Sequence, residues 1–292
     1  MRLASFTHEQ DTRVGVVVGE EIVDLRAAAP ELPHDLKALL GAGDHAMALA
    51  RRAASESSRR LPLSAVHLEA PIRHPQKFLG VGLNYADHIA ETGMPKPEFV
   101  TFFNKQSSCV NAPFDDVWIP RGERRYTDYE GELAFVIGRR CRRVPKERAH
   151  EVIAGYTIVD DVSVRDWQKR APTMTLGKSW DTHGPMGPWL VTPDELDDPH
   201  HLALKTWVNG ELRQSSNTRN MIFNCFDQIA VLSTVCTLEV GDIIATGTPG
   251  GVGVAMNPRR FLNPGDRVRI EIEAIGAIEH TFVGEPEDSA RL

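Results

Sequence analysis

The chain has 292 residues, of which 33 are lysine or arginine and 40 are aspartate or glutamate, so its formal net charge is −7. Its length allows one large domain with an appendage, or two domains. The acidic balance leaves no general positive field for a nucleic-acid backbone. The apolar fraction of 41% and charged fraction of 25% exclude a mainly disordered or fibrous chain.

The cysteines and the N-terminus indicate a reducing compartment. Four cysteines without a CxxC pair do not form the pattern of a disulfide framework. Charges within MRLASFTHEQDTRVG interrupt the apolar run that a signal peptide needs. No stretch approaches the ~18 apolar residues of a membrane span. We therefore expect a cytoplasmic protein with no membrane span and no nucleic-acid partner.

The N-terminal third changes from strand-like to helical patterning. Residues 1–27 contain the alternating runs RLASF, RVGVVVG and EEIVDL, which predict a β-meander. Residues 35–61 are rich in alanine, leucine and arginine at helical spacing. The proline-marked stretch APIRHPQK then indicates a linker. We expect a small N-terminal α+β domain over residues 1–70.

Beyond residue 74 the chain reads as mostly β with some α. Short β-branched runs separated by glycine and proline predict an antiparallel or mixed β architecture. The runs are KFLGVG, FVTFF, DDVWIP, GELAFVIG, YTIVDDV, PWLVT, LKTWVNG, GDIIATG and RVRIEIEAI. Helices are expected within 84–91, 146–155 and 220–234. We expect a catalytic domain over 74–284 and a frayed polar tail over 285–292.

The acidic residues of YTDYEGELAFVIG and YTIVDDVSVRD are the first candidate site. On a strand, Glu130 and Glu132 lie on one side about 7 Å apart. Buried together, they would repel each other and acquire a raised pKa unless a cation lay between them. Asp161, from a neighbouring strand, would complete an all-oxygen set that suits Mg²⁺, Mn²⁺ or Ca²⁺ better than zinc. A solvent-facing acidic strip is the alternative, but the apolar flanks LAFVIG and YTIV favour the metal site.

The second candidate is His88 with Glu91 in GLNYADHIAETGM. Their spacing of three places both on one face of a helical turn, where the carboxylate can orient the imidazole as a base acting on water. An ordinary surface His/Glu pair is the more common meaning of so short a motif. The following TGMPKPE is expected to form a mobile loop, and helix and loop together could serve as a lid.

The third candidate is the glycine-rich segment GDIIATGTPGGVG. Its backbone N–H groups could converge on a carboxylate, although a tight turn is an alternative. Met256 and Tyr85 stand where the third glycine of a dinucleotide fingerprint would be needed, which argues against nucleotide binding. Lys178, Arg165 and Gln168 could stabilise an oxyanion near the metal. Since neither GxSxG nor HExxH occurs, activated water is the expected attacker.

These motifs, in this order and spacing over residues 74–284, resemble the fumarylacetoacetate hydrolase family. The resemblance implies a β-roll-like catalytic domain, a homodimer, and Mg²⁺ or Mn²⁺ held by Glu130, Glu132 and Asp161. Residues 1–70 resemble the variable small domain of many bacterial members. The chain is most similar to the bacterial acylpyruvase and diketo-acid branch.

The resemblance also implies roles for individual residues. His88 and Glu91 match the lid dyad of the smaller members, and Lys178 matches the active-site lysine. The residues implied to contact substrate are Arg165, Gln168, Thr248 and Tyr85. Two departures are Gln106, where relatives often have proline after Lys105, and the lack of a fourth acidic ligand near Asn84.

The activity implied is metal-dependent cleavage of the C3–C4 bond of a small 2,4-dioxo acid, such as an acylpyruvate or diketo-sugar acid. The metal and Lys178 would stabilise an enolate while His88 activates water. Without water, the same site supports decarboxylation of a β-keto acid, keto–enol isomerisation or isomerisation of a 2-hydroxy-diene-dioate. A metal-stabilised binding module without catalysis is the remote alternative.

Overall fold

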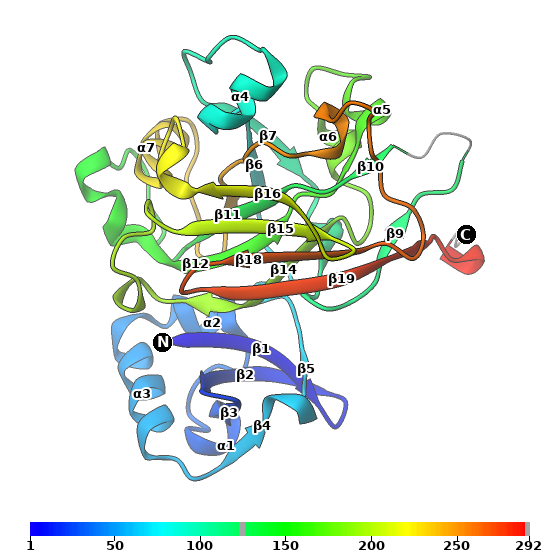
Figure 1. The fold of residues 1–292 in the computed structure, drawn as a ribbon. Coiled ribbons are helices and arrows are strands. Elements are labelled where there is room, and N and C mark those ends of the chain that lie inside the picture. The colour runs from blue at the N-terminus through cyan, green and yellow to red at the C-terminus, as the bar shows by residue number, and fades with distance from the viewer. Residues whose placement is uncertain (123–125, 290–292) are drawn as a thin grey trace.

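The computed structural model describes residues 1–122 and 126–289. The N-terminal part forms a meander with helices packed against it, as predicted (Figure 1). Its strands are β1 (Arg2–His8), β2 (Asp11–Val18), β3 (Glu21–Asp24), β4 (Arg60–Pro62) and β5 (His67–Leu68). Its helices are α1 (Leu25–Ala28), α2 (Leu36–Gly41) and α3 (Gly43–Glu56). The Asp35 carboxylate caps α2 by accepting the N–H of Ala38.

The N-terminal strands extend the main sheet of the molecule. β1 pairs antiparallel with β14 (Gly184–Val191), with Arg2 opposite Val191. The sheet order is β4-β3-β2-β1-β14-β12-β11-β17-β6-β7. The further strands are β6 (Phe78–Gly82), β7 (Thr101–Lys105), β8 (Val110–Asn111), β11 (Gly131–Ile137), β12 (Ile153–Asp160) and β17 (Ile243–Ala245). The proposed domain division near residue 70 therefore falls within a shared sheet.

A second sheet packs on strands β11, β12 and β14 of the first (Figure 1). Its order is β16-β15-β18-β19-β9. These strands are β9 (Val117–Ile119), β15 (Ala203–Val208), β16 (Glu211–Asn217), β18 (Arg267–Ile272) and β19 (Gly276–Gly284). A separate pair is formed by β10 (Thr127–Asp128) and β13 (Ser163–Val164). Parallel and antiparallel pairs both occur, so the predicted mixed, mostly β fold is confirmed.

Strand β11 is buried along its whole length because both of its faces are covered. Leu133 and Phe135 belong to the core shared with the second sheet. Ala134 and Val136 belong to the core that includes α2 and α3. A strand covered on both sides needs a nearly continuous apolar sequence, as LAFVI is. The acidic residues are therefore confined to its N-terminal end.

The remaining helices are α4 (Ala86–Thr92), α5 (Arg165–Gln168), α6 (Thr175–Lys178) and α7 (Cys225–Val235), with short 3₁₀ turns at Leu63–Ala65, Ser107–Cys109, Lys146–Val152, Pro193–Glu195, Thr218–Asn220, Gly253–Ala255 and Glu287–Ser289. These helices lie outside the two sheets, with α4, α5 and α6 in the upper part of the view and α7 against the turn that precedes β12 (Figure 1). None of the described helices is long and apolar enough to span a membrane.

Three predicted segments differ from the structure. The helix predicted over 146–155 is a 3₁₀ turn, Lys146–Val152, followed directly by β12. The helix predicted over 220–234 begins only at Cys225, because Asn224 and Asp227 form a capping box there. The first part of the tail predicted to fray is structured: the carboxylate of Glu285 accepts the N–H of Arg121, and a 3₁₀ turn follows. Residues 290–292 of this predicted tail lie outside the described part of the chain.

Gly131 offers a test of how closely the second sheet packs against the start of β11. A Cβ atom at Gly131 would lie 2.4 Å from Oγ1 of Thr206. We expect Gly131→Ala to lower the free energy of unfolding by about 1–3 kcal/mol through overpacking, measured by chemical denaturation. Gly41→Ala is the control, since a Cβ there meets nothing within 4 Å. An unchanged denaturation midpoint for Gly131→Ala would contradict this packing.

Candidate active site

The β11–β12 pairing brings the predicted acidic residues together. Gly131 lies opposite Asp160 in the ladder, and the N–H of Asp161 donates to the carbonyl of Glu130 at 2.9 Å. One carboxylate oxygen from each of Glu130, Glu132 and Asp161 lies within 4.8 Å of the others, and all three residues are buried. Glu130 stands just before the strand rather than within it. We call these three residues the carboxylate cluster.

Buried cations partly neutralise the cluster. Lys178 Nζ donates to Glu130 Oε2 at 2.7 Å and to Asp161 Oδ2 at 2.6 Å. Arg165 binds Glu130 Oε1 and also donates to Asp128 Oδ2 at 2.9 Å. Burial alone would raise the pKa of Glu130, but the charges of Lys178 and Arg165 outweigh it and lower that pKa to about 2. Glu130 is therefore ionised at neutral pH.

Among the residues that the structure describes, no cation forms a salt bridge with Glu132. Its Oε2 accepts the N–H of Gly247 at 2.8 Å, whereas its Oε1 is buried without a hydrogen-bond partner. Burial, followed by the negative charges of Asp161 and Glu130, raises the pKa of Glu132 well above its usual range. A hard divalent cation would remove both penalties, because it prefers carboxylate oxygens. The donor set therefore fits Mg²⁺ or Mn²⁺.

The cluster opens on a cavity of about 130 Å³. The predicted site residues that line it are Glu130, His88, Arg165, Gln168, Lys178 and Thr248, and its other walls are formed by Val81, Gly82, Leu83, Thr101, Phe103 and Met174. Tyr85, predicted to contact substrate, is fully buried outside this lining, with its hydroxyl unpartnered. The short segment from α5 to α6 thus supplies much of the polar wall.

Helix α4 carries the predicted dyad to the cavity. His88 Nδ1 lies 3.4 Å from Glu91 Oε2. Glu91 also accepts the N–H of Gly251 at 3.0 Å, and Asp87 accepts the N–H of Gly250 at 3.4 Å and the hydroxyl of Ser216. Helix α4 is therefore held against the glycine-rich loop by its carboxylates, and Glu91 is fixed at a position from which it can orient His88.

The glycine-rich loop binds the protein's own carboxylates. Besides Gly247 and Gly251, the N–H groups of Gly253 and Val254 donate to the two oxygens of Asp128, each at 2.9 Å. These groups are occupied internally, so for them the expectation of a ligand-binding anion hole is wrong. Gly251 has φ of +101°, and a Cβ there would lie 2.0 Å from the carbonyl oxygen of Arg213. Only glycine can follow this path.

Thr248 lines the cavity, but its hydroxyl already has two partners. It donates to the carbonyl of Gly131 at 3.0 Å and accepts from Gln214 Nε2 at 2.8 Å. Gln214 Oε1 in turn accepts the N–H of Gly131 at 3.0 Å, and its Nε2 also donates to Pro249 O. Gln214 therefore ties the start of β11 to the loop. No sequence pattern indicates Gln214, because the segment ELRQSSN of β16 that carries it lacks the β-branched residues typical of a strand.

Two further buried groups support the cluster. Lys105 Nζ donates to Asp161 Oδ1 at 2.7 Å and to the carbonyls of Lys178 and His183. Asp160 Oδ1 accepts the N–H of Glu130 at 2.8 Å, and its Oδ2 lies 2.9 Å from Nε2 of His280. The sequence indicates no firm role for Lys105. No local pattern indicates His280, because it lies 120 residues from its partner Asp160.

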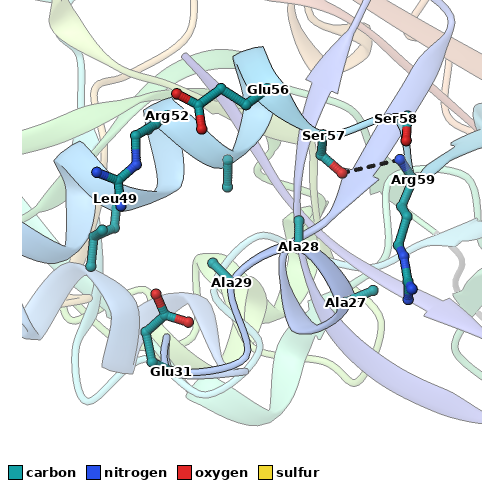
Figure 2. A pocket seen from close by; sticks show the side chains of 11 residues that line it. Ala27, Ala28, Ala29, Glu31, Leu49, Arg52, Glu56, Ser57, Ser58 and Arg59 are labelled. Carbon is teal, nitrogen blue, oxygen red and sulfur yellow. Dashed lines mark hydrogen bonds between the residues drawn. The ribbon is translucent and has the colours of Figure 1, made fainter.

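A larger hollow, of about 380 Å³, lies between α1 and α3 in the N-terminal part (Figure 2). Alanines line its base, and its charged side chains, Glu31, Arg52, Glu56 and Arg59, are all exposed. Exposed charges are well solvated and carry no strained chemistry. We therefore assign the active site to the smaller cavity at the carboxylate cluster.

Comparisons with known proteins identify the family of the chain. Residues 77–283 match the family model described as fumarylacetoacetate (FAA) hydrolase C-terminal. The chain is 42% identical over 289 residues to oxaloacetate tautomerase fahd2, mitochondrial, of Xenopus laevis, covering 97% of this chain and 90% of that one. The tautomerase Fahd2a of Rattus norvegicus is also 42% identical, with coverages of 97% and 92%.

Solved structures are similar over nearly the whole chain. Maleylpyruvate hydrolase from Sphingobium sp. SYK-6 is 36% identical, with a TM-score of 0.80 in its complex with manganese(II) and pyruvate, covering 98% of this chain and 100% of that one. Fumarylacetoacetate hydrolase from Exiguobacterium antarcticum is 35% identical, with a TM-score of 0.86 and the same coverages. The chain therefore belongs to the fumarylacetoacetate hydrolase family.

Proposed function

We propose that this protein is a divalent-metal-dependent enzyme that interconverts the keto and enol forms of a small 2-oxo dicarboxylic acid of the oxaloacetate type. The observation that carries the proposal is the buried carboxylate cluster, in which Glu132 Oε1 has no hydrogen-bond partner among the described residues, beside a cavity lined by Glu130 and Lys178. The similarity to oxaloacetate tautomerases supports the same reaction.

The size of the cavity favours a small substrate. Its volume of about 130 Å³ is well below the roughly 300–1,000 Å³ of pockets that bind drug-sized ligands. Its walls combine the cations Arg165 and Lys178 and the amide of Gln168 with the apolar Phe103 and Met174. A short dianionic acid would meet positive charge there without requiring a long apolar channel.

Mg²⁺ or Mn²⁺, held by Glu130, Glu132 and Asp161, would supply a Lewis acid that polarises the 2-oxo group. Lys178 donates two of its ammonium protons to the cluster, so one remains for the substrate oxygen on which negative charge develops. Arg165 and Gln168 would bind the carboxylate end. In the keto-to-enol direction His88, oriented by Glu91, would take the proton from C3 while Lys178 gives a proton to the 2-oxo oxygen, and the reverse direction would return both protons.

Hydrolysis of a small acylpyruvate, by cleavage of its C3–C4 bond, is the second candidate. It is favoured by the His88–Glu91 pair, because this arrangement can also activate water. The similarity to maleylpyruvate hydrolase supports it. Decarboxylation of a β-keto acid and isomerisation of a 2-hydroxy-diene-dioate pass through the same enolate and belong in the same assay panel. The homodimer that the family resemblance implies, and the cytoplasmic location expected from the cysteines and the N-terminal sequence, stay predictions.

A substrate panel separates these reactions. We expect the Mg²⁺- or Mn²⁺-loaded protein to accelerate loss of the enol absorbance of oxaloacetate more strongly than it releases pyruvate from acetylpyruvate or CO₂ from oxaloacetate. His88→Ala should lower the tautomerisation kcat about 10²- to 10⁴-fold through loss of the general base. His45→Ala, at an exposed position on α3, should leave it unchanged. Faster acetylpyruvate cleavage than tautomerisation would establish the second candidate instead.

Metal binding can be measured without any substrate. Saturating Mn²⁺, at about 100 times its Kd, should stabilise the fold by roughly 2.7 kcal/mol through mass action and raise Tm. Glu132→Gln should abolish most of that rise. Because the folded pKa of Glu132 is raised, its ionised form destabilises the metal-free fold at pH 7.5, so the variant should match or exceed the wild-type Tm without metal.

The control is Glu56→Gln, which removes an exposed carboxylate on α3. It should retain the full Mn²⁺-dependent rise in Tm. A Glu132→Gln protein that Mn²⁺ stabilises as much as the wild type would show that Glu132 is not a ligand.

A further inference from the structure

Lys178 occupies an unusual position for an active-site lysine. Its ammonium group lies between two of the three carboxylates of the cluster, 2.7 Å from Glu130 Oε2 and 2.6 Å from Asp161 Oδ2. The side chain is 2% exposed, so water does not share its charge. A cation held between carboxylates at these distances neutralises the repulsion that a metal ion would otherwise neutralise.

Every oxygen of Glu130 and Asp161 already accepts from a cation. Arg165 binds the second oxygen of Glu130, and Lys105 binds the second oxygen of Asp161. An incoming divalent ion must therefore share or take over an oxygen that a positive side chain holds. Like charges at such separations repel strongly where water is excluded. At least one of these cations has to yield.

Lys105 and Arg165 are held elsewhere. Lys105 Nζ satisfies all three of its protons, on Asp161 and on the carbonyls of Lys178 and His183, within a fully buried site. Arg165 is anchored to Asp128, which is itself fixed by the glycine-rich loop. Moving either cation would leave buried acceptors unpaired.

Lys178 has more freedom. Both of its side-chain hydrogen bonds end on carboxylates of the cluster, and it lines the cavity. Its Nζ lies 4.9 Å from the centre of the Phe103 ring, whose face can still stabilise the ammonium after a carboxylate bond is lost. Of the three cations, Lys178 can therefore move at the lowest cost.

We propose that Lys178 is the resident counter-ion of the metal-free cluster, and that it competes with the divalent ion for Glu130 and Asp161. Metal entry displaces the ammonium from at least one of these carboxylates and turns it toward the substrate. The inference rests on the metal site of the proposed function. It couples metal loading to the placement of the lysine that would bind the reacting oxygen.

The test compares Mn²⁺ affinities of metal-free proteins by isothermal titration calorimetry at fixed pH. Removing the competing charge in Lys178→Met should lower the Kd for Mn²⁺ about ten-fold or more, since a monovalent cation beside a divalent one opposes its binding. Lys77→Met is the matched control. It also removes a lysine paired with a buried carboxylate, Asp242, but outside the cluster, and its Kd should equal that of the wild type.

The outcomes separate the two proposals. If the wild-type protein binds Mn²⁺ and Lys178→Met binds it equally well or more weakly, the competition is overturned and the metal site stands. Failure of the wild-type protein to bind Mn²⁺ or Mg²⁺ overturns the metal site and the competition with it. If Lys178→Met does not fold, a crystal structure of the wild type with Mn²⁺ decides: Nζ should have left Glu130 Oε2 or Asp161 Oδ2, and retention of both hydrogen bonds overturns the proposal.

Discussion

The burial of three carboxylates where two central strands of a sheet meet is the constraint on which the site depends. Each buried ion costs several kcal/mol in desolvation unless it is paired and hydrogen-bonded. Glu130 and Asp161 meet this requirement through Arg165, Lys105 and Lys178. Glu132 does not, since within the described part of the chain its hydrogen-bond partner is a single backbone N–H. The resulting imbalance is relieved either by protonation of Glu132, whose pKa is raised, or by a hard cation.

The same electrostatic logic connects helix α4 to the carboxylate cluster. The loop from Gly247 to Val254 donates backbone N–H groups to Glu132, to Glu91 on α4 and to Asp128, the partner of Arg165. One turn therefore holds a carboxylate of the cluster together with the carboxylate that lies beside His88.

The sequence predicted the parts of the site that follow from local pattern. Alternation placed Glu130 and Glu132 together, and the apolar flanks of both acidic runs indicated buried neighbouring strands. It could not reveal Gln214 or the partners of Lys105, because these contacts join segments that lie far apart in the chain. The glycine-rich loop shows a second limit: its composition indicated an anion-binding turn, but not that the anions belong to the protein.

The choice of reaction must lie outside the carboxylate cluster. Enolate stabilisation serves tautomerisation, hydrolysis and decarboxylation equally, so ligands that are complementary to that charge cannot distinguish the products. What would distinguish them is whether a water molecule can reach the bound substrate. Here Glu91 is shared between His88 and the N–H of Gly251, and the cavity is small. A small cavity leaves little room for a water molecule beside a bound acid, and this is the physical reason for which tautomerisation is proposed ahead of hydrolysis.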